Sequence, residues 1–161
     1  MEALDPFYVK MAAYSGAALC MGLGAVGAAL GEGYTAGHAA MGMNRQPAES
    51  GNILRNMLIG QAIAETSGIF ALLVAIFLVL ISFTAALPKV FGLLAAGLST
   101  GFAGLGTGVG AGIVSADAAS GIARQPEASS RVTLTMVIGQ AVSQSTTVYA
   151  LLVSLILIFA I

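Results

Sequence analysis

The sequence has few of the residues that cover the surface of a water-soluble protein. Only 8% of its 161 residues are charged, whereas a soluble domain carries roughly 25%. It has no tryptophan, one cysteine and one histidine. With no Cys pair, no second His and no Ser-His-Asp set, it supports neither an internal disulfide nor metal or nucleophilic catalysis. No basic, aromatic stripe indicates a nucleic-acid partner. We expect no cofactor, and a chain that by itself breaks no bond.

The sequence is instead 58% hydrophobic, and these residues form long uncharged runs. The runs cover residues 11–31, 66–88, 90–116 and 132–161. Each meets or exceeds the roughly 18–20 residues with which a helix crosses about 30 Å of hydrocarbon. The sequence therefore predicts an all-α membrane protein with four transmembrane helices. The acidic start MEALDP and the length of the first run indicate no cleavable signal peptide.

The few basic residues predict the orientation of these helices. Arginines flank two polar loops, and lysines lie on the opposite side; they are Arg45, Arg55, Arg124 and Arg131, against Lys10 and Lys89. Cytoplasmic loops of membrane proteins carry an excess of Lys and Arg. We therefore expect both polar loops in the cytoplasm and both termini outside, in the inner (plasma) membrane of a cell.

An internal repeat divides the chain into two similar halves. A shift of 79 residues carries the string RQP at 45–47 onto 124–126, and GQA at 60–62 onto 139–141. Each half predicts one helical hairpin, with residues 1–86 as the first and 87–161 as the second. His38 and Asp117 also align, and we expect both to be solvated near the cytoplasmic interface.

The first helix of each half carries glycines four residues apart. The pairs are Gly27/Gly31, Gly33/Gly37, Gly97/Gly101, Gly104/Gly108 and Gly108/Gly112. In a membrane, small residues at this spacing let helix backbones approach closely. We expect these two helices to form a tightly packed inner wall, with the bulkier second helices outside.

Two glutamates, Glu32 and Glu65, lie within the predicted helices. A carboxylate in hydrocarbon is costly and indicates function by default. Both are equally far along the chain from the middle of the loop after Pro47, so a helical turn there brings them to the same depth. Two adjacent carboxylates at low dielectric cannot both stay charged. A proton or small cation would neutralise them, with the hydroxyls of Thr66 and Ser67 as further ligands; a purely structural hydrogen bond is the alternative.

The second half lacks this pair of acids. Ala111 and Gln144 stand at the equivalent positions and are also predicted to meet at one depth. They offer no carboxylate, so the chain carries one acidic site for two hairpins.

The motifs resemble those of a known family. The strings GEGYTAGHAAMGMNRQP at residues 31–47 and MLIGQAIAETSGIFALLVA at 57–75 look like the c subunit of bacterial F-type ATP synthases. The resemblance covers nearly the whole chain, twice. It implies a ring that rotates in the membrane, surrounded by lipid, in which each buried glutamate carries an ion past an arginine of the stator's a subunit. It also implies loops that touch the central-stalk subunits gamma and epsilon, through Arg45, Gln46, Pro47, Arg124, Gln125 and Pro126.

Fusion of two hairpins departs from the usual F-type pattern. Fused hairpins with half the carboxylates are similar to the larger c subunit of V-type pumps, which is the alternative assignment. If every unit of the ring is this chain, the ions moved per turn equal the number of chains. A ring mixed with single-hairpin c subunits remains open.

The resemblance also implies the ion and its ligands. Sodium-carrying members combine an inner-helix Gln or Glu with a Glu followed by two Ser or Thr, and with a Tyr one turn further. Glu32, Glu65, Thr66 and Ser67 match this pattern, whereas Phe70 replaces the tyrosine. Na⁺ at Glu65 and Glu32 is therefore favoured over H⁺.

The family's sites lie between neighbouring hairpins. The resemblance implies that an aliphatic residue supplies a backbone carbonyl, here Ile63 or its equivalent Val142. Glu32 and Glu65 would then face Val142 and Ser145 of a second-half hairpin, with Thr146 and Tyr149 nearby. The other interface, Ala111 and Gln144 against Ile63 and Thr66, would bind no ion.

Two other classes of protein are weaker alternatives. A small ion-coupled carrier of four helices would use one membrane glutamate, but the chain has few aromatics for a substrate pocket. A structural proteolipid would leave Glu65 unexplained.

Overall fold

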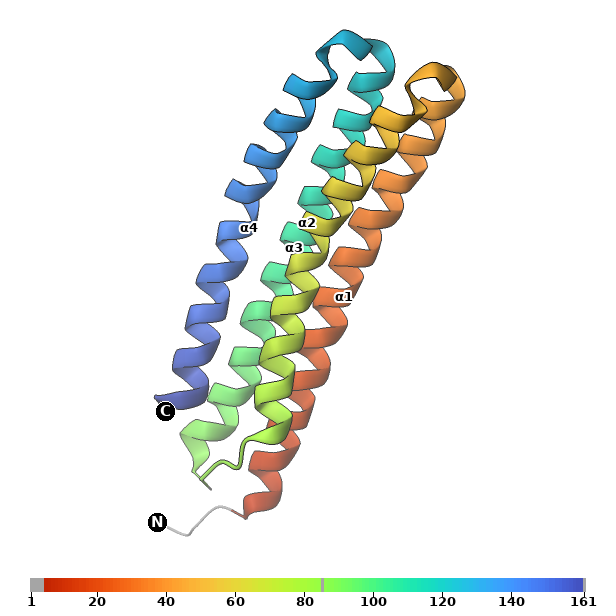
Figure 1. Cartoon of the computed structure of the whole chain (residues 1–161). Helices are drawn as coiled ribbons and strands as arrows, with labels where there is room; N and C mark the ends of the chain where they lie inside the picture. Colours follow the sequence, from red (N-terminus) through yellow and green to blue (C-terminus); the bar gives the residue numbers. More distant parts are fainter. Residues whose placement is uncertain (1–4, 85, 161) are drawn as a thin grey trace.

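The chain folds into two helical hairpins that lie side by side (Figure 1). The computed structural model describes residues 5–84 and 86–160; the acidic start at 1–4, and residues 85 and 161 of the predicted runs, lie outside this part. The helices are α1 (Pro6–Arg45), α2 (Ser50–Leu80), α3 (Leu87–Arg124) and α4 (Ser129–Phe159), with short 3₁₀ turns η1 (Pro47–Glu49) and η2 (Pro126–Ala128). All four long helices are long and apolar enough to cross a membrane. The predicted all-α fold of four membrane helices is confirmed.

The uncharged runs located these helices but misplaced their ends. The first run stops at Gly31, whereas α1 continues to Arg45. The second run starts at Thr66, which lies in the middle of α2. A charged residue interrupts a hydrophobic run, but Glu32 and Glu65 have good helix propensity and do not interrupt a helix.

Proline ends both first helices at the same place. Gln46 and Gln125 precede Pro47 and Pro126, and a residue before proline is driven out of the α-helical region. Their backbone angles are nearly identical, with φ −137° and ψ 75° at Gln46 and φ −136° and ψ 78° at Gln125. The RQP strings therefore place two equivalent turns at one end of the bundle, opposite the start of α1 and the end of α4 (Figure 1).

The two glycine-rich helices, α1 and α3, form the most extensive contact in the chain. A Cβ at Gly31 would overlap the carbonyl oxygen of Gly108, and a Cβ at Gly97 would overlap that of Gly16. Backbone therefore packs on backbone, as predicted. The expectation was wrong for Gly33 and Gly37 within one chain, because nothing lies within 4 Å of a Cβ at either position.

Buried polar side chains join α4 to the rest of the bundle. Ser154 bonds to Thr100 over 2.8 Å, and Thr147 bonds to Thr107 over 2.5 Å. The Lys89 ammonium, buried at the start of α3, donates to the carbonyl oxygen of Ile158 over 2.6 Å. Such bonds hold membrane helices together where the hydrophobic effect between helices is absent.

Candidate functional site

Glu65 is the central residue of α2, with fifteen residues on either side. At 1.5 Å per residue it lies roughly 22 Å from each end of the helix. Its side chain is exposed on the surface of the single chain. The other charged residue of α2 is Arg55, ten positions nearer the loop. The carboxyl group therefore lies midway along a helix that is long and apolar enough to cross a membrane, and at the centre of a bilayer an isolated charge is costly.

The carboxyl group of Glu32, on α1, meets that of Glu65. The two carboxyl groups lie close enough to interact directly, and at low dielectric two adjacent carboxylates cannot both stay charged. Oε1 of Glu32 is buried and, within the described part of the chain, accepts no bond from an amide, hydroxyl or amine. The structure thus brings together the two acids that the sequence placed at one depth.

Gln61 fixes the two helices at this level, and sequence reasoning gave it no role. Its Nε2 donates to the backbone oxygen of Glu32 over 3.1 Å. The equivalent Gln140 donates to the backbone oxygen of Ala111 over 2.8 Å. The repeated string GQA was the available signal, because a polar side chain kept at the same place in both halves indicates a shared contact.

The hydroxyl groups beside Glu65 point in different directions. Thr66 is half-buried and donates to the carbonyl oxygen of Ile63 over 2.6 Å. Ser67 is fully buried, donates to Ala64, and lies on the face of α2 that packs into the bundle. Residues two positions apart lie on nearly opposite faces of a helix. The structure therefore does not bring Ser67 to the Glu65 carboxyl group.

In the second hairpin, an amide occupies the place of the acid. Gln144 is the central residue of α4 and only 8% exposed. Its Nε2 donates to the carbonyl oxygen of Ile63, on α2, over 3.1 Å. Gln140, one turn away, also donates to Gly60 over 3.3 Å. The interface between the two hairpins of one chain is thus closed by neutral amides, with Ala111 behind them.

The remaining predicted ligands lie on the free side of α4. Val142 and Tyr149 are 68% and 63% exposed. Ser145 is half-buried and Thr146 exposed; their hydroxyls donate to Val142 over 2.7 Å and to Ser143 over 2.9 Å. The bond from Ser145 to Val142 repeats, 79 residues later, the bond from Thr66 to Ile63. Within one chain these groups do not reach Glu65, so a site that uses them needs a second chain.

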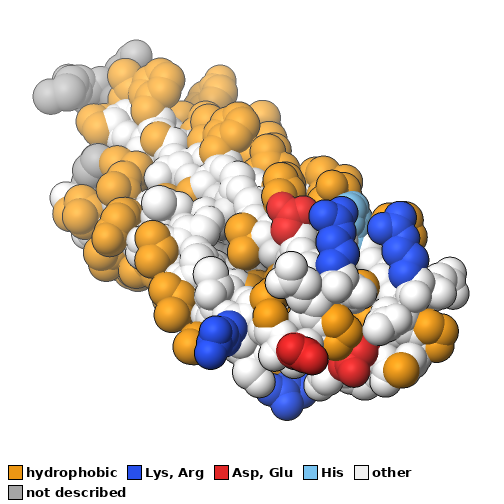
Figure 2. Space-filling view, turned by 90° about the horizontal axis from the view of Figure 1, so that it is seen from above, with side chains coloured by type: hydrophobic (Ala, Val, Ile, Leu, Met, Phe, Trp, Pro, Cys, Tyr) orange, Lys and Arg blue, Asp and Glu red, His pale blue; other side chains and the backbone are white. Residues whose placement is uncertain are grey.

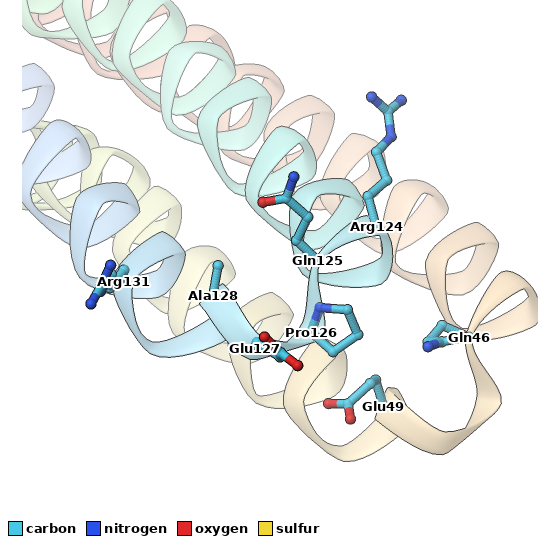
Figure 3. A pocket seen from close by; sticks show the side chains of 8 residues that line it. All are labelled: Gln46, Glu49, Arg124, Gln125, Pro126, Glu127, Ala128 and Arg131. Carbon is cyan, nitrogen blue, oxygen red and sulfur yellow. The ribbon is translucent and has the colours of Figure 1, made fainter.

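The two loops line a separate cavity of about 790 Å³ that is open to the surface (Figure 3). Its walls carry both charges, and the residues are Gln46, Glu49, Arg124, Gln125, Pro126, Glu127, Ala128 and Arg131. Of the predicted loop residues, Gln46, Arg124, Gln125 and Pro126 line this cavity, whereas Arg45 lines another pocket with His38.

The expectation of a solvated His38 was wrong. The ring is half-buried, its Nδ1 lies 3.1 Å from Ser120 Oγ, and it packs at a tilt of 46° against the Tyr34 ring, with ring centroids 4.5 Å apart. Close packing of α1 on α3 brings Ser120 within reach, which the spacing within one helix does not reveal. Asp117 is exposed, as expected.

Comparison with known proteins gives the family. The sequence matches the model of the ATP synthase C subunit twice, over residues 15–78 and 94–157. It is 48% identical over 68 residues to the ATP synthase c subunit of Thermotoga maritima, covering 42% of this chain and 80% of that protein. It is 51% identical over 71 residues to the ATP synthase c subunit of Syntrophobacter fumaroxidans, covering 44% and 79% respectively. The chain therefore belongs to the family of ATP synthase C subunits and carries the family's hairpin twice.

Proposed function

We propose that the chain is a rotor subunit of a rotary ATP synthase or ATPase, and that it carries one ion at Glu65. The observation that supports this most is the carboxyl pair of Glu65 and Glu32 at the centre of the membrane helices. An ion or proton on this pair cancels its charge, so the site can face lipid. An arginine of the stator's a subunit would attract the bare carboxylate and release the ion. Repeated loading and release would turn a ring of these chains.

The contact between the two hairpins serves as a template for the contact between chains. Inside the chain, Gln144 donates to Ile63 O. The repeat equivalent of Gln144 is Glu65, and that of Ile63 is Val142. The same contact between chains would therefore place Glu65 against Val142 O of a neighbouring chain. Both partners are on the surface of the single chain. An interface of two different faces that repeats from chain to chain forms a closed ring when the rotation closes.

The oxygen atoms at this interface favour Na⁺, with H⁺ as the competing ion. Glu65 and Glu32 would supply carboxyl oxygens, and the neighbour would supply Val142 O and Ser145 Oγ. Tyr149 of the neighbour would supply the hydroxyl that Phe70 lacks, with Thr146 close by. Hard cations prefer such oxygen ligands.

One acid for two hairpins sets the ratio of ions to rotation. A ring built of this chain alone would move one ion per chain in each turn. Fewer ions per ATP give each ion more free energy, which suits pumping against a steep gradient. The V-type arrangement has the same ratio of one ion to two hairpins. Single-hairpin c subunits in the same ring would raise the number of ions moved per hairpin.

The loops and their orientation complete the proposal. The RQP loops would face the cytoplasm of the inner membrane and touch the central-stalk subunits gamma and epsilon. The excess of arginine at this end supports that orientation. The mixed charges around the 790 Å³ cavity offer both donors and acceptors to a stalk protein.

Modification with a hydrophobic carbodiimide tests the ion site. This reagent reacts with a protonated carboxyl group in the membrane, so Glu65 of the purified complex should be modified. Na⁺ should slow the reaction and K⁺ should not. Modification of Glu65 that is indifferent to Na⁺ would assign the site to protons, and the absence of any modification would contradict an ion site at Glu65. A closed ring in the electron microscope distinguishes a rotor from a dimeric carrier.

A further inference from the structure

A second, smaller pocket opens between the loop ends of α1 and α3. Its volume is about 210 Å³, and it is lined by His38, Met41, Gly42, Arg45, Ser120, Ala123 and Arg124. Four of these seven residues have side chains that donate hydrogen bonds, and two of those four carry a full positive charge. Within residues 5–84 and 86–160, no Asp or Glu lines the pocket. Two arginines facing one small space repel each other unless an anion lies between them.

The donors of this pocket come from both helices. His38 on α1 and Ser120 on α3 lie 3.1 Å apart, Nδ1 to Oγ, and the Tyr34 ring packs at a tilt against the imidazole ring. Arg45 and Arg124 occupy equivalent positions in the last turns of α1 and α3. Because α1 and α3 pack backbone on backbone, the helix positions of all four residues are fixed relative to one another, while the Arg45 and Arg124 side chains themselves are exposed.

The acids of the loops do not neutralise this end of the pocket. In Figure 3, the Arg124 side chain points away from Glu127 and Glu49, which lie on the far side of the loop. Figure 2 looks onto the loop end and shows the histidine between two Lys or Arg side chains. The basic groups therefore lie together at the loop ends of α1 and α3; Figure 2 also shows an acidic side chain beside one of them, and Arg124 lines the cavity between the loops as well.

The repeat shows that the histidine of this pocket is specific to the first half of the chain. The shift of 79 residues carries Arg45 onto Arg124 but His38 onto Asp117. Asp117 is exposed and lines a different, mainly apolar pocket with Arg131. The first half thus presents a histidine where the second half presents an acid.

We propose that the pocket of His38, Ser120, Arg45 and Arg124 binds a phosphate group. Guanidinium groups bind phosphate oxygens through paired, charge-assisted hydrogen bonds, and the imidazole and hydroxyl groups offer further donors. The pocket lies where hydrophobic helices end, which is the level of phosphates in a bilayer. Exposed Tyr34 and Met41 continue the surface toward the membrane centre. The phosphate would come from an anionic phospholipid or from free inorganic phosphate.

Calorimetric titration of the intact complex, stripped of lipid in detergent, tests this site. The probes are inorganic phosphate, dihexanoyl phosphatidylglycerol and dihexanoyl phosphatidylcholine. We expect saturable binding of one phosphate group per chain, weakened about tenfold or more by Arg45→Gln with Arg124→Gln. His38→Asp, which copies the second half, should weaken it to a similar degree. Tighter binding of phosphatidylglycerol than of phosphate assigns the site to lipid, and equal binding assigns it to phosphate itself.

A matched pair of variants separates this site from general attraction to positive charge. Arg55→Gln with Arg131→Gln removes the same charge from the same end of the chain but lines no part of this pocket. This control should bind the probes within about twofold of the natural chain, since distant charges are screened. Equal losses in both pairs, or no saturable binding of either anionic probe, would overturn the proposal. If the double variant fails to assemble, Ser120→Ala decides: about threefold weaker binding is expected, and unchanged binding refutes the site.

Discussion

Replacing Gln144 with glutamate should create a second titratable site in each chain. The amide is only 8% exposed, lies at the centre of α4 and donates to Ile63 O over 3.1 Å. A protonated carboxyl group has almost the same shape and can donate to the same oxygen. An ionised one would lose a hydrogen bond worth about 1 kcal/mol and place a charge at the membrane centre, at about 2.5–3.5 kcal/mol.

These magnitudes decide the charge of the new group. At about pH 6, water favours the ionised form of a glutamate by roughly 2.3 kcal/mol. The penalty of about 4 kcal/mol is larger, so the carboxyl group at position 144 should be mostly protonated and the interface should stay closed. The chain with Gln144→Glu should therefore assemble like the natural one.

Carbodiimide labelling and infrared spectroscopy measure the outcome. Mass spectrometry should find two modified carboxyl groups per chain, and the group at position 144 should react more slowly because it is buried. The infrared band of protonated carboxyl groups should increase even where the reagent has no access. Gln144→Leu should add neither signal. An assembled Gln144→Glu protein with no second label and no stronger band would refute the reasoning about this interface.

Three further changes have defined outcomes. Glu65→Gln should abolish carbodiimide modification in the membrane span while leaving assembly intact, and ATP hydrolysis by the complex should lose its response to Na⁺; persistent labelling would move the site elsewhere. Gly108→Ala places a Cβ 2.8 Å from the carbonyl oxygen of Gly27 and should destabilise the chain by about 1–3 kcal/mol. Thermal unfolding should show this loss of stability. The control Gly51→Ala should show no such loss, because a Cβ at Gly51 meets nothing within 4 Å. Lys89→Met removes the bond to Ile158 O and should lower stability by about 1–3 kcal/mol in the same measurement, whereas the exposed equivalent Lys10→Met should have little effect.

Periodicity within single helices was enough to predict the depth of the site, but not which faces of the hairpins meet. Glu32 and Glu65 meet because depth along a helix follows from counting residues. Ser67 also lies at this depth, but its side chain points into the bundle, since rotation around the helix depends on packing against α1 and α3. The pairing of His38 with Ser120 also depends on packing between helices. The two residues are 82 positions apart in the chain, and the glycine contacts between α1 and α3 bring them together.

Gln144, which stands where the first hairpin has an acid, can make the hydrogen bond of a protonated carboxyl group. An amide N–H₂ donates a hydrogen bond as a protonated carboxyl group does, but it cannot lose its proton. Gln144 bound to Ile63 O therefore resembles a site that stays loaded. In a rotating ring, the second hairpin could cross the lipid without an ion and would leave no bare charge in front of the stator. Under the proposed function, the chain would need only Glu65 to be filled before it leaves the stator, and each step of rotation would span two hairpins for one ion.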